Sequence, residues 1–265
     1  GVWLSSALGV VAGYYLLRGF VIQRWAVVGA ALLLLQPGFQ LVWGQSYWGG
    51  TLAFAGGGLL LGAAKRLLAG PMLSHAAIAA AGATLLAVTR PFEGLVVCMC
   101  AAAWILCSWH RTGWPDLRDV ALKLVLPQAA IFVVGAVVLA GYNAAVTGSI
   151  TTMPYQVHEQ QYGIAPLFLW QSPHSPPFYN NEAVARFHLD WSMDWYRKQQ
   201  SVVGLIVTKA KMLYLMREVF LPAAIALPLL ALPWWRGRKV RTPLILFAAV
   251  LAVTLLAACT DPSSG

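Results

Sequence analysis

The sequence predicts an all-α membrane protein of about eight transmembrane helices, with a cap of interfacial helices and loops on its outer face. Hydrophobic residues make up 59% of the 265 residues and charged residues only 10%, whereas a soluble domain carries about 25% charged residues. Near-uncharged apolar runs recur along the whole chain, and together they exceed what one globular core can bury. A soluble enzyme is therefore not the expected class.

The apolar runs predict eight membrane crossings. We place them at 1–17, 25–42, 50–64, 73–89, 95–109, 120–141, 219–235 and 243–259. Several runs are shorter than the roughly 20 residues that a perpendicular helix needs, so these helices are expected to be tilted or shielded by neighbours. Within 50–64, Gly58 and Gly62 form a small-xxx-small pair that Gly56 and Gly57 extend, a pattern typical of close helix packing.

Loop charges predict the orientation. With eight spans, 11 of the 18 lysines and arginines fall on one face, and most of the other 7 lie in or just after one long loop, whose charges count little toward orientation. The first face is therefore predicted to be cytoplasmic. Acidic residues sort the opposite way, which leaves +9 inside and 0 outside. The basic surplus is then a topology signal, and nucleic-acid binding is not expected, because the cations are scattered over short loops.

The sequence predicts no disulfide framework and no cofactor. All four cysteines, Cys98, Cys100, Cys107 and Cys259, lie inside predicted spans. The histidines of the long loop lack any tight ligand spacing such as HExxH, so no metal site is assigned and a divalent metal has no support. No Walker loop, dinucleotide fingerprint or Gly-x-Ser-x-Gly elbow is present.

Three parts follow from this topology. They are predicted helices 1 to 6 in 1–142, an extracytoplasmic cap with amphipathic helices in 143–218, and helices 7 and 8 in 219–265. The connection 143–201 holds 10 aromatic residues among its 59 positions, and disordered segments are poor in aromatic residues. Phe187, Trp191 and Trp195 recur at i, i+4 and i+8 between charged residues, as in an interfacial amphipathic helix. Such residues serve either as membrane anchors or as ligand contacts.

Polar segments meet on the predicted outer face. They are 45–50, 89–94 and the long connection 143–201. In the first of them, Gln45 and Tyr47 offer an amide and a hydroxyl for hydrogen bonds to a sugar. The convergence of these segments is the main sequence signal for a functional site.

Arg90 and Glu93 lie at the mouth of two consecutive spans. Pro91 is expected at the first turn of the second helix, where its missing N–H costs nothing. Two interpretations stay open. Glu93 is either a charge matched to the helix start, or it accompanies a phosphate site in which Arg90 offers its planar fork of donors beside a helix N-terminus.

Several motifs carry a resemblance to a known family. They are QSYWGGTLAFAGGGLLLG at 45–62, Thr89-Arg90-Pro91-Phe92-Glu93-Gly94, Tyr142-Asn143, Thr147-Gly148-Ser149, Met153-Pro154-Tyr155, Gln161-Tyr162-Gly163 and Pro166-Leu167-Phe168. Across roughly 25–235 the chain resembles bacterial multi-spanning proteins related to the GT-C glycosyltransferases. The protein mannosyltransferase and aminoarabinose transferase group, related to glycosyltransferase family 39, is the nearest named relative.

The resemblance implies an enzyme of the bacterial inner membrane. Such enzymes take a sugar from a polyprenyl-phosphate carrier and transfer it to a lipid, glycan or protein acceptor on the extracytoplasmic face. The implied substrate-binding residues are Arg90 for the carrier phosphate, with Glu93, Gln45, Tyr47, Tyr155 and Tyr162 lining the cavity.

The family's catalytic carboxylate lies in the first outer loop. That loop is expected upstream of Gly1, so we expect the chain to be part of a longer enzyme and assign no catalytic base. Two alternatives stay open: a transporter or flippase of a lipid-linked substrate, and a non-catalytic membrane scaffold whose cap binds a partner. The sequence leaves the sugar, the acceptor and the oligomeric state undetermined.

Overall fold

The computed structural model describes residues 1–36, 38–39, 49–220 and 248, and their regular elements are helices, which confirms the all-α class. The described chain divides into two compact units. One contains residues 1–136 with residue 248, and the other contains residues 137–220. The division falls inside helix α7, the same helix that contains the predicted boundary at residue 142.

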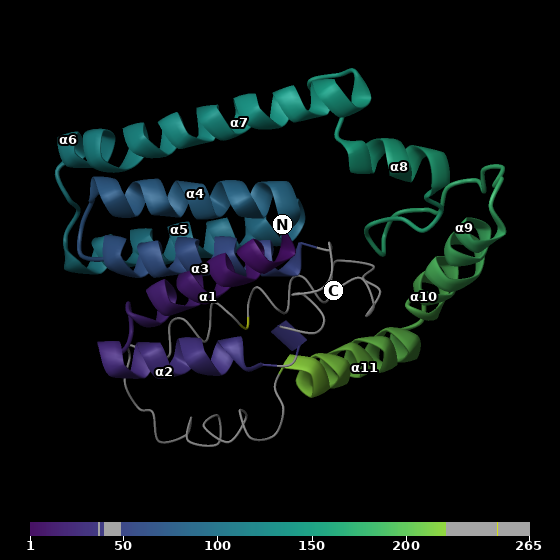
Figure 1. The fold of residues 1–265 in the computed structure, drawn as a ribbon, viewed down its shortest axis with the longest axis horizontal. Coiled ribbons are helices and arrows are strands. Elements are labelled where there is room, and N and C mark those ends of the chain that lie inside the picture. The colour runs from purple at the N-terminus through teal and green to yellow at the C-terminus, as the bar shows by residue number, and fades with distance from the viewer. Residues whose placement is uncertain (37, 40–48, 221–247, 249–265) are drawn as a thin grey trace. The chain divides into compact units, whose positions relative to one another are not determined.

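Helices of the first unit pack side by side, and short turns follow α1, α3, α4 and α5 (Figure 1). They are α1 (Val2–Leu17), α2 (Gln23–Leu34), α3 (Gly50–Leu67), α4 (Leu73–Thr89), α5 (Pro91–Thr112), α6 (Leu117–Val120), the π-helical η2 (Ala121–Val125) and the first part of α7 (Leu126–Thr147). Each of the first six predicted spans overlaps a helix, because each apolar run is bounded by charged, glycine or proline turns.

The helix α2 is shorter than predicted. It ends at Leu34 instead of continuing through the predicted span 25–42. Pro37 explains the end, because proline disfavours helical geometry at the residue before it and has no N–H for a helix hydrogen bond. Residues 40–42 of that span lie outside the described residues.

Two opposite ends of this unit are defined by side-chain contacts. We call one of them the Arg90 end, and it consists of residues 1–5, 49–51 and 89–93. The hydroxyls of Ser5 and Thr51 lie 2.8 Å apart there, in a hydrogen bond. Gly49, with φ +74°, lies against Thr89 there, so the starts of α1 and α3 meet the end of α4. Since α3 and α4 run in opposite directions, their connecting turn lies at the other end.

The other end carries the positive charge, and we call it the basic end (residues 18–21, 65–70 and 109–123). Arg66 donates to the Tyr15 carbonyl at 3.0 Å, and its guanidinium lies 4.0 Å from the centre of the Tyr15 ring. The Trp109 indole donates to the Leu67 carbonyl at 3.0 Å, which ties the end of α5 to the end of α3. The described connections that follow α1, α3 and α5 therefore lie at the basic end, and the connection that follows α4 lies at the Arg90 end.

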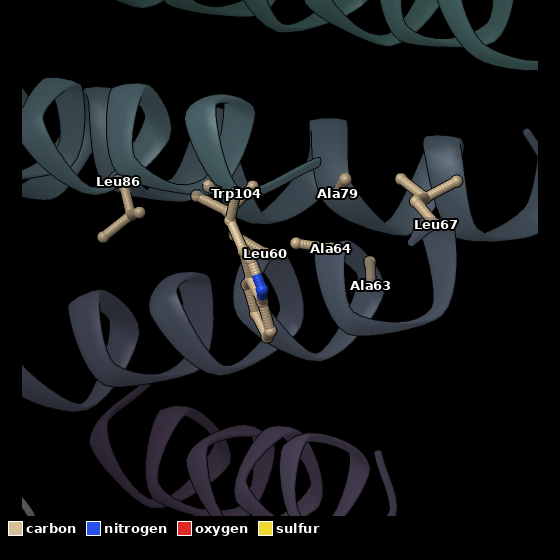
Figure 2. Packing of buried hydrophobic residues seen from close by; sticks show 8 residues of the cluster. Leu60, Ala63, Ala64, Leu67, Ala79, Leu86 and Trp104 are labelled. Atoms are coloured by element: carbon tan, nitrogen blue, oxygen red, sulfur yellow. The ribbon is translucent and has the colours of Figure 1, made fainter. Parts of the chain in front are cut away.

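The helix α3 forms the centre of the first unit, between α1 on one side and α4 and α5 on the other. Its buried cluster joins small and large apolar side chains from three helices: Leu60, Ala63, Ala64, Leu67, Ala79, Leu86, Ala101 and Trp104 (Figure 2). A large ring such as Trp104 fits because alanines opposite it leave room.

Close backbone approach confirms the packing role predicted for the glycines of α3. A Cβ on Gly56 would lie 2.9 Å from the Gly82 carbonyl oxygen, and one on Gly58 would lie 3.1 Å from the Ala12 carbonyl oxygen. A Cβ on Gly62 would lie 2.8 Å from the Tyr15 ring and 3.1 Å from the Leu16 Cα. Gly57 differs from the prediction, because a Cβ there would meet no described atom within 4 Å.

Two described helices are long and apolar enough to cross a membrane, namely Pro91–Thr112 with 22 residues and the continuous run Leu117–Thr147 with 31 residues. The second run keeps its apolar side chains exposed, among them Val133 at 63% and Val137 at 66%. A helix that is apolar on all sides and packs little is suited to lipid. These helices indicate membrane association. The helices α1, α2 and α4 are apolar but shorter.

The second unit is also helical. Beyond the last part of α7 it contains α8 (Pro154–Tyr162), α9 (Glu182–Arg186), the π-helical η3 (Phe187–Ser192), α10 (Met193–Lys198) and α11 (Val202–Phe220). The segments α9, η3 and α10 form one continuous helix, which confirms the helix predicted through Phe187, Trp191 and Trp195. Asn181 begins it, because its side-chain oxygen accepts from the backbone N–H groups of Ala183 and Val184.

We expect Gly82→Ala to lower stability more than Gly57→Ala. A Cβ on Gly82 would lie 2.6 Å from the Gly56 carbonyl oxygen and 2.7 Å from the Leu60 nitrogen, and backbone atoms cannot move aside as side chains can. Overpacking of this kind costs about 1–3 kcal/mol. The midpoint of thermal unfolding in detergent measures the difference, and an equal midpoint for both variants would show that α3 and α4 do not approach so closely.

Candidate functional site

The Arg90 turn joins two helices directly. α5 begins at Pro91 with Arg90 as its N-cap, and Glu93 lies in its first turn, as predicted. The Arg90 backbone closes α4 by donating to the Leu86 carbonyl at 2.7 Å, and its own carbonyl accepts from Gly94 at 2.7 Å. The half-buried Arg90 side chain is therefore fixed at the junction of α4 and α5.

Two helix N-termini lie next to each other at this junction. α3 begins beside Thr89, because its N-cap Gly49 lies against that side chain. Neither α3 nor α5 has a side-chain cap, and α3 has no acidic residue in its first turn. Each N-terminus carries about half a positive charge. Two N-termini against the single α4 C-terminus, with Arg90 between them in the chain, make the junction suited to an anion.

A hollow of about 300 Å³ lies at the same end, between the starts of α1 and α3. Ser5, Leu8 and Thr51 are among its lining residues. The hydroxyls there supply hydrogen-bonding groups in a mostly apolar wall, as ligand sites commonly do. The predicted sugar contacts Gln45 and Tyr47 lie outside the described residues.

The second unit brings a different group of predicted residues together. Tyr162 lies in a cluster of aromatic and imidazole rings, which we call the cap cluster: His158, Tyr162, Tyr179, Phe187 and His188. The His188 ring stacks near Tyr179, with centroids 5.9 Å apart, and near Tyr162, at 6.4 Å. The Tyr179 hydroxyl donates to the Tyr162 carbonyl at 2.7 Å, which ties the loop before α9 to α8.

Burial sets the protonation of the cap cluster. His188 is only 6% exposed, and its burial, together with the nearby His158 imidazole, lowers the pKa of His188 below its ordinary value of 6.5. Burial also raises the pKa of the Tyr179 hydroxyl. Both groups are therefore neutral near pH 7, and the cluster can stack without an unpaired buried charge.

The structure does not unite all predicted site residues. Arg90 and Glu93 belong to the first unit, and Tyr155 and Tyr162 belong to the second. Tyr155 is 53% exposed and lies on α8, the helix that also carries Tyr162. It takes part in none of the ring contacts that define the cap cluster. Among the described residues, no group of three or more His, Cys, Asp and Glu side chains could hold a metal ion.

Two polar features were not predicted from the sequence. The cap cluster is one, since Tyr162, Tyr179 and His188 are far apart along the chain. The other is Asn143, which is 2% exposed and donates to the Ile150 carbonyl at 3.3 Å. Its amide oxygen accepts no hydrogen bond within the described part of the chain. A polar residue in a long apolar run was the only available sign of it.

No known protein family, curated protein or solved structure matches this chain. The resemblance to the GT-C glycosyltransferases therefore rests on the motifs at 45–62, 89–94 and 142–168. The function is inferred from the chain's own residues.

We expect the stability of the second unit to fall as the pH drops below about 6.5. The folded state holds His188 neutral, so between its lowered folded pKa and its unfolded pKa the unfolded chain binds the additional proton. The contribution of neutral His188 to the free energy of unfolding is fully present above the pKa that His188 has in the unfolded chain. It is lost as the pH falls toward the pKa that His188 has in the folded state. Hydrogen exchange of residues 187–196, corrected for the intrinsic pH dependence, measures it.

The variant His188→Gln should remove this part of the pH dependence, because glutamine does not titrate. His174→Gln serves as the control, since His174 is exposed and lies outside the cap cluster. An unchanged pH slope in His188→Gln would exclude His188 as the titrating group.

Proposed function

We propose that this chain belongs to a membrane glycosyltransferase of the GT-C type. In this proposal the protein takes a sugar from polyprenyl phosphate and transfers it to a lipid, glycan or protein acceptor on the extracytoplasmic face. The observation that carries the proposal is the junction at Arg90, where this residue begins α5, the start of α3 lies against Thr89, and neither helix start has a side-chain cap.

The membrane embedding that we propose is multi-pass, with about eight crossings. In support, the described connections of the first unit lie at the basic end after α1, α3 and α5 and at the Arg90 end after α4. The shorter apolar helices α1, α2 and α4 would cross with their ends extended into the headgroup region. The predicted spans 219–235 and 243–259 lie outside the described residues, apart from residue 248.

The proposed orientation places the basic end in the cytoplasm. Described cations of that end are Arg18, Lys65, Arg66, Arg111, Arg118 and Lys123. The Arg90 end has Arg90 as its described cation, with Glu93 close by in sequence. The positive-inside rule then assigns the Arg90 end and the second unit to the extracytoplasmic side.

Chemistry at the Arg90 junction would act on the phosphate. In sugar transfer from polyprenyl phosphate, the bond between the anomeric carbon and the phosphate oxygen breaks, and the carrier phosphate leaves with more negative charge. A guanidinium and helix N-termini that favour this charge lower the barrier more than they favour the substrate. The acceptor hydroxyl needs a general base, and no described carboxylate is assigned that role.

We expect Arg90→Ala to reduce sugar transfer by about 100-fold while membrane insertion is retained, because one charge-assisted donor to a developing anion contributes on this scale. Arg90→Lys should recover only part of the activity, since an ammonium lacks the bidentate fork. Transfer from a radiolabelled polyprenyl-phosphate sugar in membranes measures both.

The matched control is Arg24→Ala, an exposed arginine in the first turn of α2. Equal transfer by Arg90→Ala and Arg24→Ala would remove Arg90 from the mechanism. Counterflow of the labelled donor without covalent transfer would favour a transporter instead.

Single cysteines should report the two sides of the membrane. In a background without native cysteines, Ser175→Cys in the second unit should react with an impermeant maleimide added to intact cells. Ala69→Cys, in the turn between α3 and α4, should react only after permeabilisation. Both positions are exposed in the structure, so burial does not explain a difference. Labelling of both positions in intact cells would contradict the orientation.

A further inference from the structure

A second hollow, of about 260 Å³, lies between α3, α4, α5 and the η2–α7 helix. Alanines form much of its wall: Ala64, Ala79, Ala83, Ala101 and Ala102. Because these side chains end at Cβ, they leave volume that no described neighbour fills. Apolar hollows stay dry, and an empty one forfeits the contacts of its lining atoms. The occupant that this hollow suits is therefore apolar.

The hollow opens sideways. Ala102 and Leu106 on α5 and Phe132 on α7 line it and are themselves exposed, Leu106 at 47% and Phe132 at 46%. The opening therefore lies between the two described helices that are long and apolar enough to cross a membrane. A hydrocarbon chain can enter this hollow from a bilayer without passing through water.

One wall changes from charged to apolar along its length. Leu124, Gln128 and Phe132 follow one another at i, i+4 and i+8 and all line the hollow. Lys123, half-exposed and paired with Asp119 at 2.9 Å, precedes them. Gln128 lies about 7 Å further along the helix than Lys123. A cation, an amide and a ring thus occur in the order of a phospholipid's phosphate, ester carbonyl and acyl chain.

Further cations lie at the basic end, close along the chain to residues that line the hollow. Arg111 follows the lining residue Trp109 by two positions, and Arg118 lies on α6, which continues into the lining helix. Both arginines are exposed. Trp114, 63% exposed, lies between them in sequence, and exposed tryptophan is typical of the headgroup region. Basic residues between helices on the cytoplasmic side are typical of sites for anionic lipid headgroups.

We propose that this hollow binds one acyl chain of an anionic phospholipid, whose phosphate lies among Arg111, Arg118 and Lys123. The lipid would fill the space between α5 and α7 in the cytoplasmic leaflet. This site is at the basic end, apart from the Arg90 junction. The proposal depends on the chain crossing a membrane and does not depend on sugar transfer, so the two proposals can fail separately.

Native mass spectrometry of the detergent-purified protein, with dioleoyl phosphatidylglycerol or dioleoyl phosphatidylcholine added, tests the site. We expect one phosphatidylglycerol to remain bound, and phosphatidylcholine to bind at least about tenfold more weakly, since each cation near the phosphate contributes about fivefold. Equal binding of the two lipids would overturn the proposal. Preferential retention of polyprenyl phosphate would overturn it as well, by assigning the hollow to the carrier tail.

Matched variants locate the lipid. Ala102→Phe fills the hollow and should lower phosphatidylglycerol binding about tenfold or more, because several methylene groups lose their place. Ala103→Phe, at the adjacent exposed position that does not line the hollow, should bind as the wild type does. Equal binding by both variants would overturn the proposal.

The double variant Arg118→Gln/Lys123→Gln tests the headgroup. It leaves the hollow intact and should lower the preference for phosphatidylglycerol over phosphatidylcholine by about 25-fold or to the part that Arg111 alone supplies, since each cation contributes about fivefold. An unchanged preference would contradict the assignment of these cations. Circular dichroism of each variant establishes that it is folded, so a loss of binding reports on the site.

Discussion

The close approach of α3 to its neighbours is the constraint on which the first unit depends. In lipid, helices gain nothing from removing apolar side chains from water, so their association depends on contact at short range. Gly56 brings α3 against the backbone of Gly82 on α4, and Gly58 brings it against Ala12 on α1. This contact places the start of α3 beside Thr89 and its end beside Trp109. Both candidate ligand regions of the first unit thus depend on the same glycines.

Arg66 and Arg90 differ in their position relative to the helix ends. Arg66 donates to the Gly62 and Tyr15 carbonyls, at 2.6 and 3.0 Å, and covers the Tyr15 ring. Its charge lies in the last turn of α3, where the helix dipole favours a cation. Arg90 instead lies where one helix C-terminus meets two N-termini, and these N-termini favour an anion beside it.

Apolar runs predicted the positions of the first unit's helices well, because each run is bounded by charged, glycine or proline residues. The span 73–89 contains α4 from Leu73 to Thr89, and Pro91 correctly predicted where α5 begins. The end of α2 was missed, although Pro37 was the signal for it. The cap cluster could not be predicted, because its stacking depends on the way the loop before α9 folds back onto Tyr162. The alanine-lined hollow was equally hidden, since alanine in a span indicates close packing as readily as open space.

The π-helical stretch η3 contains a polar side chain that is turned inward, that of His188. In a regular α-helix, His188 would share a face with Ser192, four residues on. The wider π turn of η3 instead puts it in line with Met193, which is buried at 7% exposure beside Tyr196. The stretch η2 precedes Gln128, whose amide lines the apolar hollow on the same helix face as Leu124 and Phe132. A hydropathy period of 3.6 assumes that no π turn is present, so it assigns His188 to the wrong face. Since π turns occur frequently at functional sites, this departure at η3 is itself a reason to test His188.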